Sequence, residues 1–268
     1  MRSHGADLSP QLLLLHGVTN SARVWDDVVP LLGADFSLIV PTAAGHRGGP
    51  AAVGRATISG LVDDVEALLD ERGLASVHIA GNSMGGWMAI ELARRGRALS
   101  VCALSPAGCW TPGEADETHA TSTIRRGRLM ARMAGPLAPL VLRSSVLRRR
   151  FLRDAAERGD RLTPRQAADM VRDLAGCVVA PDLLGTTERV LPMDPLPCPV
   201  TVAWSSEDRI FPPEVNAVSA RQLLPGARHL CLDGVGHVPM IDDPDLCARV
   251  IREVVRSGPD GPEVASTA

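Results

Sequence analysis

The chain of 268 residues contains no tyrosine and no lysine, and aromatic residues make up only 3% of it. Its core must therefore be built from leucine, valine, alanine and methionine. All of its strongly basic side chains are arginines, and a formal net charge of -3 gives no reason to expect a nucleic acid as partner. With 45% hydrophobic and 22% charged residues, the composition is that of an ordinary globular protein that can bury a substantial core.

Cysteine pairs and long apolar runs are also missing. The six cysteines include no Cys-x-x-Cys pair, so we expect no zinc site or redox motif and interpret them as free, buried thiols. The apolar run at residues 12–15 is too short for a signal peptide or a membrane span. We therefore expect a soluble cytoplasmic protein without stable membrane insertion, metal or organic cofactor, either a monomer or a homodimer.

Short apolar runs alternate with helical patterns along much of the chain. Such runs end at residues 15, 41, 80, 104, 204 and 232, and the segments between several of them repeat apolar residues at three- and four-residue steps. This alternation predicts an α/β fold of three layers, in which a mostly parallel sheet lies between two layers of helices.

The pattern changes between residues 110 and 195, where strand signals vanish and arginine-rich helical sequence takes over. From residue 121 to 165 there are twelve arginines and only three acids. We interpret residues 110–195 as a helical cap inserted in a core formed by residues 1–109 and 196–258. The last ten residues, 259–268, are rich in glycine and proline and are predicted to be a flexible tail.

One serine lies between small residues where a strand pattern gives way to a helical one. Residues 81–85 read Gly-Asn-Ser-Met-Gly, a G-x-S-x-G arrangement. A serine on a sharp strand-to-helix turn exposes its Oγ, and Gly81 and Gly85 remove the side chains that would collide around it. The following helix directs its free N–H groups at the same point, where they favour developing negative charge. Ser83 is therefore the candidate nucleophile.

A serine nucleophile needs a base, and the base needs an acid that orients it. Asp208 follows a later predicted strand, and His237 follows the strand after that, which gives the chain order Ser, Asp, His. Because the carboxyl ends of parallel strands share one edge of a sheet, we expect the three side chains to meet there. Glu207 is an alternative orienting acid, and we favour Asp208.

An oxyanion hole requires two backbone N–H donors. The N–H of Met84 follows the nucleophile, and the loop after the first strand offers the N–H of Val18. Gly17 would let this loop approach Ser83 closely. His16 is expected to brace the loop by hydrogen bonding and to take no part in the chemistry.

Four motifs together resemble the α/β-hydrolase superfamily: His-Gly at 16–17, Gly-Asn-Ser-Met-Gly-Gly at 81–86, the segment 206–212 and Gly-His at 236–237. The resemblance implies a hydrolase in which the N-terminal hairpin of the usual fold is reduced or absent. The serine segment is similar to that of small esterases, of cofactor-free haloperoxidase-like enzymes and of carbon–carbon bond hydrolases. Val238 departs from the last group, which usually carries tryptophan after the histidine.

Three functions follow from these observations. The leading one is hydrolysis of a small, mainly apolar ester, thioester or lactone through an acyl-enzyme on Ser83, which would make the protein a carboxylic ester hydrolase. A second is carbon–carbon cleavage of a vinylogous diketone acid, with a cap arginine holding the carboxylate. The third is a ligand-binding receptor or chaperone built on a hydrolase scaffold.

The cap is expected to provide substrate specificity. Trp25, Trp87, Met130 and Met133 are candidate lining residues of an apolar, adaptable pocket. Most cap arginines should form solvated helix faces. One or two could pair with a substrate carboxylate, and attraction to an anionic membrane surface is a further alternative.

Overall fold

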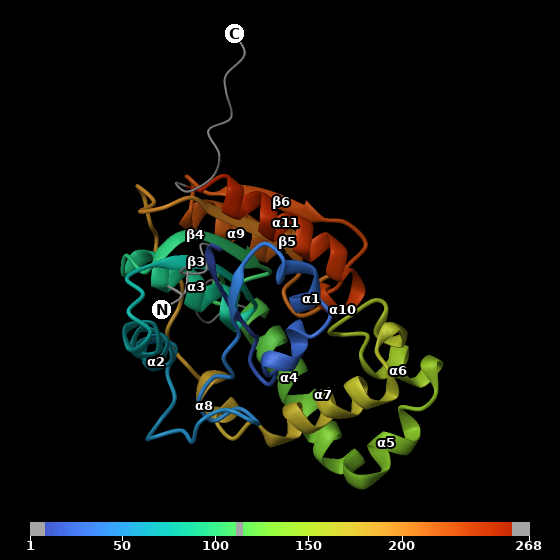
Figure 1. Cartoon of the computed structure of the whole chain (residues 1–268). Helices are drawn as coiled ribbons and strands as arrows, with labels where there is room; N and C mark the ends of the chain where they lie inside the picture. The colour runs from blue at the N-terminus through green and yellow to red at the C-terminus, as the bar shows by residue number, and fades with distance from the viewer. Residues whose placement is uncertain (1–8, 111–114, 259–268) are drawn as a thin grey trace, which may run out of the picture.

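The computed structural model of the chain describes residues 9–110 and 115–258, apart from the side chains of residues 115–117 and 136. The predicted tail, 259–268, lies outside them. Within the described residues, six parallel strands form one sheet in the order β2-β1-β3-β4-β5-β6 (Figure 1). The strands are β1 (Gln11–Leu15), β2 (Ser37–Ile39), β3 (Val77–Asn82), β4 (Ala98–Leu104), β5 (Val200–Ser205) and β6 (Arg228–Leu232). The predicted parallel sheet is confirmed.

The first strand shows why an uninterrupted apolar run becomes the centre of a sheet. Successive side chains of a strand point to opposite faces. Leu13 and Leu15 accordingly join one core cluster, while Leu12 and Leu14 join the other. A strand buried on both faces needs no polar alternation, as expected for the interior of a parallel sheet.

Helices cover both faces of the sheet. The side chains of α2, α3 and α9 belong to the first core cluster, and those of α1, α10 and α11 to the second. These helices are α1 (Val29–Leu32), α2 (Ile58–Glu71), α3 (Met84–Arg94), α9 (Pro213–Leu223), α10 (Pro239–Asp242) and α11 (Pro244–Arg256). The apolar pattern at 24–32 suggests one helix, but the structure has a 3₁₀ turn at Ala22–Trp25 and the separate short α1. The break is consistent with Pro30, which lacks an N–H and stands in the first turn of α1.

The described residues between β4 and β5 include five α-helices, which lie at one end of the molecule (Figure 1). They are α4 (Ala115–Ala134), α5 (Ala138–Val141), α6 (Ser145–Phe151), α7 (Pro164–Gly176) and α8 (Ala180–Leu183). The two longest helices of this insertion, α4 and α7, pack against each other. The insertion therefore has the position and the helical character predicted for the cap.

The cysteines are unpaired in the structure. Four are buried, whereas Cys198 is half-buried and Cys231 is exposed, so the prediction of buried thiols is correct for four of the six. Burial raises the pKa of both Cys102 and Cys109 to about 12, which keeps these thiols protonated and unreactive. Among the described residues, no helix has the length and apolar character needed to cross a membrane.

Candidate active site

Ser83 lies at the turn between β3 and α3 in a strained backbone conformation, with φ 57° and ψ -119°. A Cβ atom on Gly81 would overlap the carbonyl oxygen of Gly85, and one on Gly85 would overlap the carbonyl oxygen of Leu15. Both glycines are therefore required by close backbone contacts. The turn holds Ser83 at the N-terminus of α3, as the G-x-S-x-G pattern predicts.

Asp208 and His237 meet at the carboxyl edge of the sheet. Nδ1 of His237 is 2.8 Å from Oδ2 of Asp208, and both residues are at least 96% buried. The other carboxylate oxygen, Oδ1, accepts hydrogen bonds from the N–H groups of Ile210 and Phe211, at 2.9 and 2.7 Å. Three donors thus hold the carboxylate in place. Glu207 is exposed, so the structure places Asp208 beside the histidine.

The loop after β1 approaches the serine closely. A Cβ atom on Gly17 would lie 3.1 Å from Cβ of Ser83, so only a small residue leaves this gap open. Val18 follows Gly17 and faces the same two cavities as Ser83. The N–H groups of Val18 and Met84 donate to no described residue. Both predicted oxyanion donors are thus unengaged beside Ser83.

His16 supports this loop in the way predicted. Its Nδ1 lies 2.8 Å from the carbonyl oxygen of Gly17, and its Nε2 accepts a hydrogen bond from the N–H of Ala43 at 3.0 Å. Burial, with a smaller effect from the nearby His46, lowers the pKa of His16 to about 3. The imidazole therefore stays neutral near pH 7, which the accepted hydrogen bond at Nε2 requires. His46 packs edge-on against it, at 4.9 Å between ring centroids.

Asn82, which precedes the nucleophile, connects the serine turn to the histidine loop. Its fully buried Nδ2 donates to the carbonyl oxygen of His237 at 2.8 Å and to that of Leu104 at 3.1 Å. A single amide therefore fixes the backbone of the histidine relative to the turn that carries Ser83. The variable position of a G-x-S-x-G pattern gave no indication of this role.

Asp242 connects the histidine loop to the helical insertion. Its buried carboxylate accepts hydrogen bonds from the N–H of Gly236 at 2.7 Å, of Glu157 at 3.0 Å and of Arg158 at 2.6 Å. In addition, the N–H of Val238 donates to the carbonyl oxygen of Ala155 at 2.8 Å. Segments that are about 80 residues apart in the sequence are thus joined directly beside His237.

Asp173 on α7 makes the corresponding connection to the loop after β1. This carboxylate is 97% buried, and it accepts a hydrogen bond from Oγ of Ser21 at 2.5 Å. It also pairs with Arg47 at 2.7 Å and, more weakly, with Arg23 at 3.4 Å. Because Ser21 lies only three residues beyond Val18, the insertion is anchored to the loop that carries one of the unengaged N–H groups.

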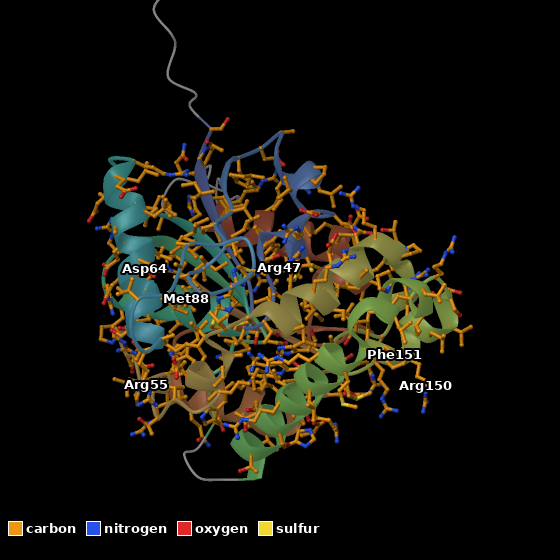
Figure 2. All side chains as sticks on the ribbon, turned by 90° about the horizontal axis from the view of Figure 1, so that it is seen from below. Arg47, Arg55, Asp64, Met88, Arg150 and Phe151 are labelled. Atoms are coloured by element: carbon orange, nitrogen blue, oxygen red, sulfur yellow. The ribbon has the colours of Figure 1, made fainter. Side chains whose placement is uncertain are left out.

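Two cavities border Ser83. The first, of about 130 Å³, is also lined by His237 and by Phe151, whose side chain at the end of α6 is 51% exposed and is labelled in Figure 2. The second is a narrow space of about 30 Å³. Trp87, Trp110 and Phe211 line it and follow one another at 5.9 and 5.6 Å between ring centroids. The Phe211 ring also packs edge-on against His237, at 5.0 Å.

The four predicted lining residues have different outcomes. Trp87 lines the narrow cavity, in agreement with the prediction. Trp25 is fully buried in the core beside β1 and reaches neither cavity. Met130 and Met133 are 50% and 78% exposed and also line neither cavity, so the prediction was wrong for all three. The helical pattern of α4 identified an apolar face, but this part of it points to solvent.

No arginine is among the described residues that line the two cavities, and Asp154 is the only carboxylate there. The described arginines of the insertion instead bind backbone carbonyls, form ion pairs such as Arg172 with Asp169, or extend into solvent. Arg148 is the clearest case: it is 92% buried and donates to the carbonyl oxygens of Leu142, Arg143 and Asp160. The space at Ser83 is therefore apolar, with no positive side chain to receive a carboxylate.

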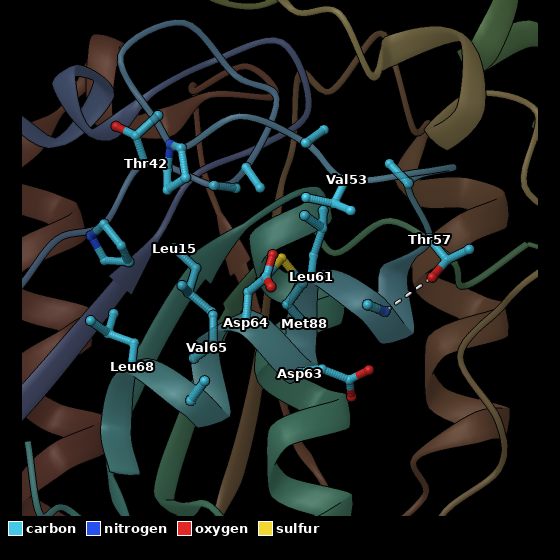
Figure 3. A pocket seen from close by; sticks show the side chains of 18 of the residues that line it. Leu15, Thr42, Val53, Thr57, Leu61, Asp63, Asp64, Val65, Leu68 and Met88 are labelled. Carbon is cyan, nitrogen blue, oxygen red and sulfur yellow. Dashed lines mark hydrogen bonds between the residues drawn. The ribbon is translucent and has the colours of Figure 1, made fainter. Parts of the chain in front are cut away.

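A larger hollow, of about 570 Å³, lies elsewhere. It is formed by α2 and the loop after β2, with Leu15 and Met88 among its lining (Figure 3). Thr57, whose Oγ1 accepts from the N–H of Gly60 at 3.0 Å, caps the helix at one side of it. It includes none of the three residues Ser83, Asp208 and His237. Nor do three His, Cys, Asp or Glu side chains of the described residues cluster as a metal site requires.

Comparisons with known proteins identify the family. The model of the Alpha/beta hydrolase family matches residues 12–250. Epoxide hydrolase EphH of Mycobacterium tuberculosis is 34% identical over 200 residues, covering 73% of this chain and 93% of that protein. A pimeloyl-acyl-carrier-protein methyl ester esterase of Aromatoleum aromaticum is 28% identical over 258 residues, covering 92% and 98%. The structure of a thermophilic esterase from Thermogutta terrifontis is 26% identical with a TM-score of 0.71, covering 92% and 90%.

Proposed function

Because the chain belongs to the alpha/beta hydrolase family and is a hydrolase, we propose that it cleaves a small, mainly apolar ester, thioester or lactone through an acyl-enzyme on Ser83. One observation carries this proposal. Ser83 stands on a strained turn and shares a cavity with His237, whose ring is held by the threefold-anchored carboxylate of Asp208. In the proposed arrangement, residues 110–195 act as the cap that closes this cavity.

In the proposed mechanism, Nε2 of His237 accepts the proton of the Ser83 hydroxyl as its oxygen attacks the substrate carbonyl. Asp208 accepts a hydrogen bond from Nδ1–H and so keeps Nε2 unprotonated and directed at the serine, and it stabilises the imidazolium that forms. The developing oxyanion receives hydrogen bonds from the N–H groups of Val18 and Met84. His237 then protonates the leaving group, and a water activated by the same imidazole hydrolyses the acyl-enzyme.

The two cavities explain the proposed substrate class. Both border Ser83 but have largely different linings, so we propose that the acyl and leaving groups of an ester occupy one each. Aromatic and aliphatic side chains dominate both linings, and this favours uncharged, apolar groups on either side of the carbonyl. The narrow cavity suits a small group, and the cavity that opens at Phe151 accepts a longer one.

Epoxide hydrolysis, which the Mycobacterium tuberculosis relative's name describes, does not fit a serine nucleophile. Attack of Ser83 on an epoxide would form an alkyl ether. An ether has no carbonyl for water to attack, so the enzyme would be blocked after one turnover. A covalent route to epoxide opening needs a carboxylate nucleophile, which would form a hydrolysable ester.

Carbon–carbon cleavage is likewise disfavoured by the lining of the cavities. That reaction was expected to require an arginine for the substrate carboxylate, and no described arginine lines either cavity. Burying a carboxylate there without a partner would be strongly unfavourable.

Substrate profiling tests the proposal. The wild-type protein and Ser83→Ala should be assayed with p-nitrophenyl esters of short to medium acyl chains, a dienol-keto acid and styrene oxide. We expect ester turnover that Ser83→Ala abolishes, and little turnover of the other two. Faster cleavage of the dienol-keto acid would overturn the ester assignment. Ligand binding without turnover of any substrate, retained in Ser83→Ala, would instead support the receptor or chaperone alternative.

A further inference from the structure

Most of the exposed large apolar side chains of the described residues lie at one end of the helical insertion. We call residues 125–153, from the middle of α4 to just beyond α6, the cap tip. Met133, Leu140 and Val146 are 78%, 63% and 73% exposed there, and four further leucine, methionine and phenylalanine side chains are at least half exposed. Figure 1 shows α5 and α6 projecting away from the sheet. Proteins that stay free in water rarely expose so many large apolar side chains together.

The cap tip is also strongly and uniformly cationic. Its sequence contains nine arginines and no aspartate or glutamate. Arg126, Arg143 and Arg150 are exposed, and their guanidinium groups form no ion pair or hydrogen bond with a described residue. Figure 2 shows Arg150 at the outer end of the insertion, next to Phe151. Positive charge is therefore interspersed with apolar side chains on this surface.

Three of these arginines line a hollow of about 270 Å³ between α4 and α8. Arg125, Arg128 and Arg132 follow one another at three- and four-residue steps, and no carboxylate lines the hollow. Each donates to a backbone carbonyl near the end of α7 or α8. A helix end offers only about half an elementary charge, so most of the positive charge is uncompensated. Burial and the charge of Arg132 both lower the pKa of Arg128. A phosphate group would relieve this repulsion.

The cap tip borders the cavity of Ser83 at Gly127, Phe151 and Leu152, of which Phe151 is the most exposed. Phe151 belongs to the tip, is 51% exposed and lines the cavity that also contains Ser83 and His237. A molecule that reaches the protein through the apolar surface of the tip therefore arrives at the opening of this cavity.

We propose that the cap tip docks on the surface of an anionic phospholipid bilayer, with its apolar side chains inserted between headgroups and its arginines bound to lipid phosphates. A surface that combines exposed apolar side chains with arginines and lacks acids has the character of a peripheral membrane-binding segment. The hollow of Arg125, Arg128 and Arg132 receives one headgroup phosphate. If the proposed esterase function holds, lipophilic esters enter the cavity from the bilayer at Phe151.

Charge argues against a second copy of the chain as the occupant. A twofold dimer would bring the same patch of both protomers together, and here it would oppose nine arginines to nine arginines. The shape of the cap tip favours a bilayer over an acidic protein as the partner. A projecting surface can insert into a fluid bilayer, whereas a folded protein would need a complementary concave surface to bind it.

Vesicle binding tests the docking independently of the proposed function. The Ser83→Ala protein should be sedimented with vesicles of phosphatidylcholine alone and with vesicles containing an equal share of phosphatidylglycerol. We expect binding to the anionic vesicles that weakens as salt is added, and little binding to the neutral ones. Absence of binding to anionic vesicles would overturn the proposal, and so would equal binding to both.

Matched variants locate the surface. Met133→Asp combined with Leu140→Asp should lower partitioning at least about tenfold, because two inserted side chains are lost. Val215→Asp with Val218→Asp, on exposed positions of α9, should have no effect. Arg143→Gln with Arg150→Gln should weaken binding about fivefold for each arginine, whereas Arg221→Gln with Arg249→Gln should weaken it less. Equal effects of the tip and α9 variants would contradict docking through the tip.

Two further measurements distinguish binding to a lipid bilayer from binding to a soluble phosphate compound or to a second copy of the protein. Inorganic phosphate should bind only weakly in a calorimetric titration, because one phosphate engages the hollow without the apolar surface. The proposal would be overturned if inorganic phosphate bound tightly, Arg128→Gln abolished this binding, and the protein did not bind vesicles. The hollow would then be a site for a soluble phosphate compound. Sedimentation velocity tests self-association. If the protein formed a dimer that Met133→Asp dissociates, and did not bind vesicles, the apolar surface would be a dimer interface.

Discussion

The surroundings of Ser83 and the cap tip use polar side chains in opposite ways. Beside Ser83, the side chains of Asn82, Asp208 and Asp242 are buried, and each binds two or three specific backbone or side-chain groups. On the outer surface of the cap tip, the guanidinium groups of Arg126 and Arg150 are exposed and have no partner among the described residues. Buried polar groups must be satisfied to be tolerated, so the first region is rigid by necessity. The second is free to adapt to what it contacts.

The largest effect is expected where the fixed network touches the reacting atoms. Asp208→Asn should lower kcat about 10,000-fold, because an amide cannot hold His237 in the tautomer that activates Ser83. Steady-state ester hydrolysis measures this effect. The neighbouring Glu207→Gln is the matched control and should retain wild-type activity. If the two variants had similar effects, Asp208 would not be the orienting acid.

A smaller loss is expected from a residue that acts through backbone position. Asn82→Ala removes the hydrogen bond to the carbonyl oxygen of His237 and should lower kcat about 10- to 100-fold, since a displacement of about 1 Å at the reacting groups can cause such losses. KM should change little, because Asn82 lines neither cavity. A rise in KM at constant kcat would indicate that Asn82 acts on substrate binding and does not position the histidine.

A still smaller loss of activity is expected when the contact between α7 and the loop after β1 is weakened. Asp173→Asn weakens the contacts to Ser21 and Arg47, and we expect unfolding free energy to fall by about 1–3 kcal/mol and kcat by about tenfold. Chemical denaturation and ester hydrolysis measure the two effects. The half-buried Asp169 on the same helix, which pairs with the exposed Arg172 at 2.9 Å, provides the control: Asp169→Asn should change both quantities far less. Loss of stability at unchanged kcat would show that Asp173 stabilises the fold but does not position the N–H of Val18 for catalysis.

The smallest effect is expected at the cap tip. Met133→Ser should change unfolding free energy by no more than about 0.5 kcal/mol and leave turnover of a water-soluble ester unchanged, because the side chain is 78% exposed. Trp87→Ala, at a position that sequence patterns did not distinguish from Met133, should alter both. A large effect of Met133→Ser on turnover of this ester would indicate that Met133 contacts the substrate after all. The cap tip and the surroundings of Ser83 would then not differ in the way described above.

The sequence was sufficient to predict the core of the molecule. Apolar runs such as residues 12–15 and the glycines around Ser83 reflect close packing, which leaves few alternatives. The order of Ser83, Asp208 and His237 follows from the parallel sheet, because the strands end at one edge. These predictions depend on local patterns and on one topological rule.

The residues that were missed or misplaced depend on long-range contacts. Most of the groups that Asn82, Asp173 and Asp242 bind lie between 22 and 155 positions away, and nothing in the local sequence identifies these partners. For Met130 and Met133, helical periodicity identifies an apolar helix face, but it does not show whether that face packs against the core, lines the pocket or is exposed to solvent. A face expected to line the pocket can then lie on the surface.

The central claim is that Ser83 is a nucleophile activated by its fixed surroundings. Intact-mass spectrometry after incubation with a fluorophosphonate tests it most directly, because only an activated serine reacts rapidly. The account predicts a single adduct that peptide mapping places on Ser83. Labelling should be lost in Ser83→Ala and strongly slowed in Asp208→Asn. A wild-type protein that remains folded and unlabelled, or one labelled at another residue, would contradict it.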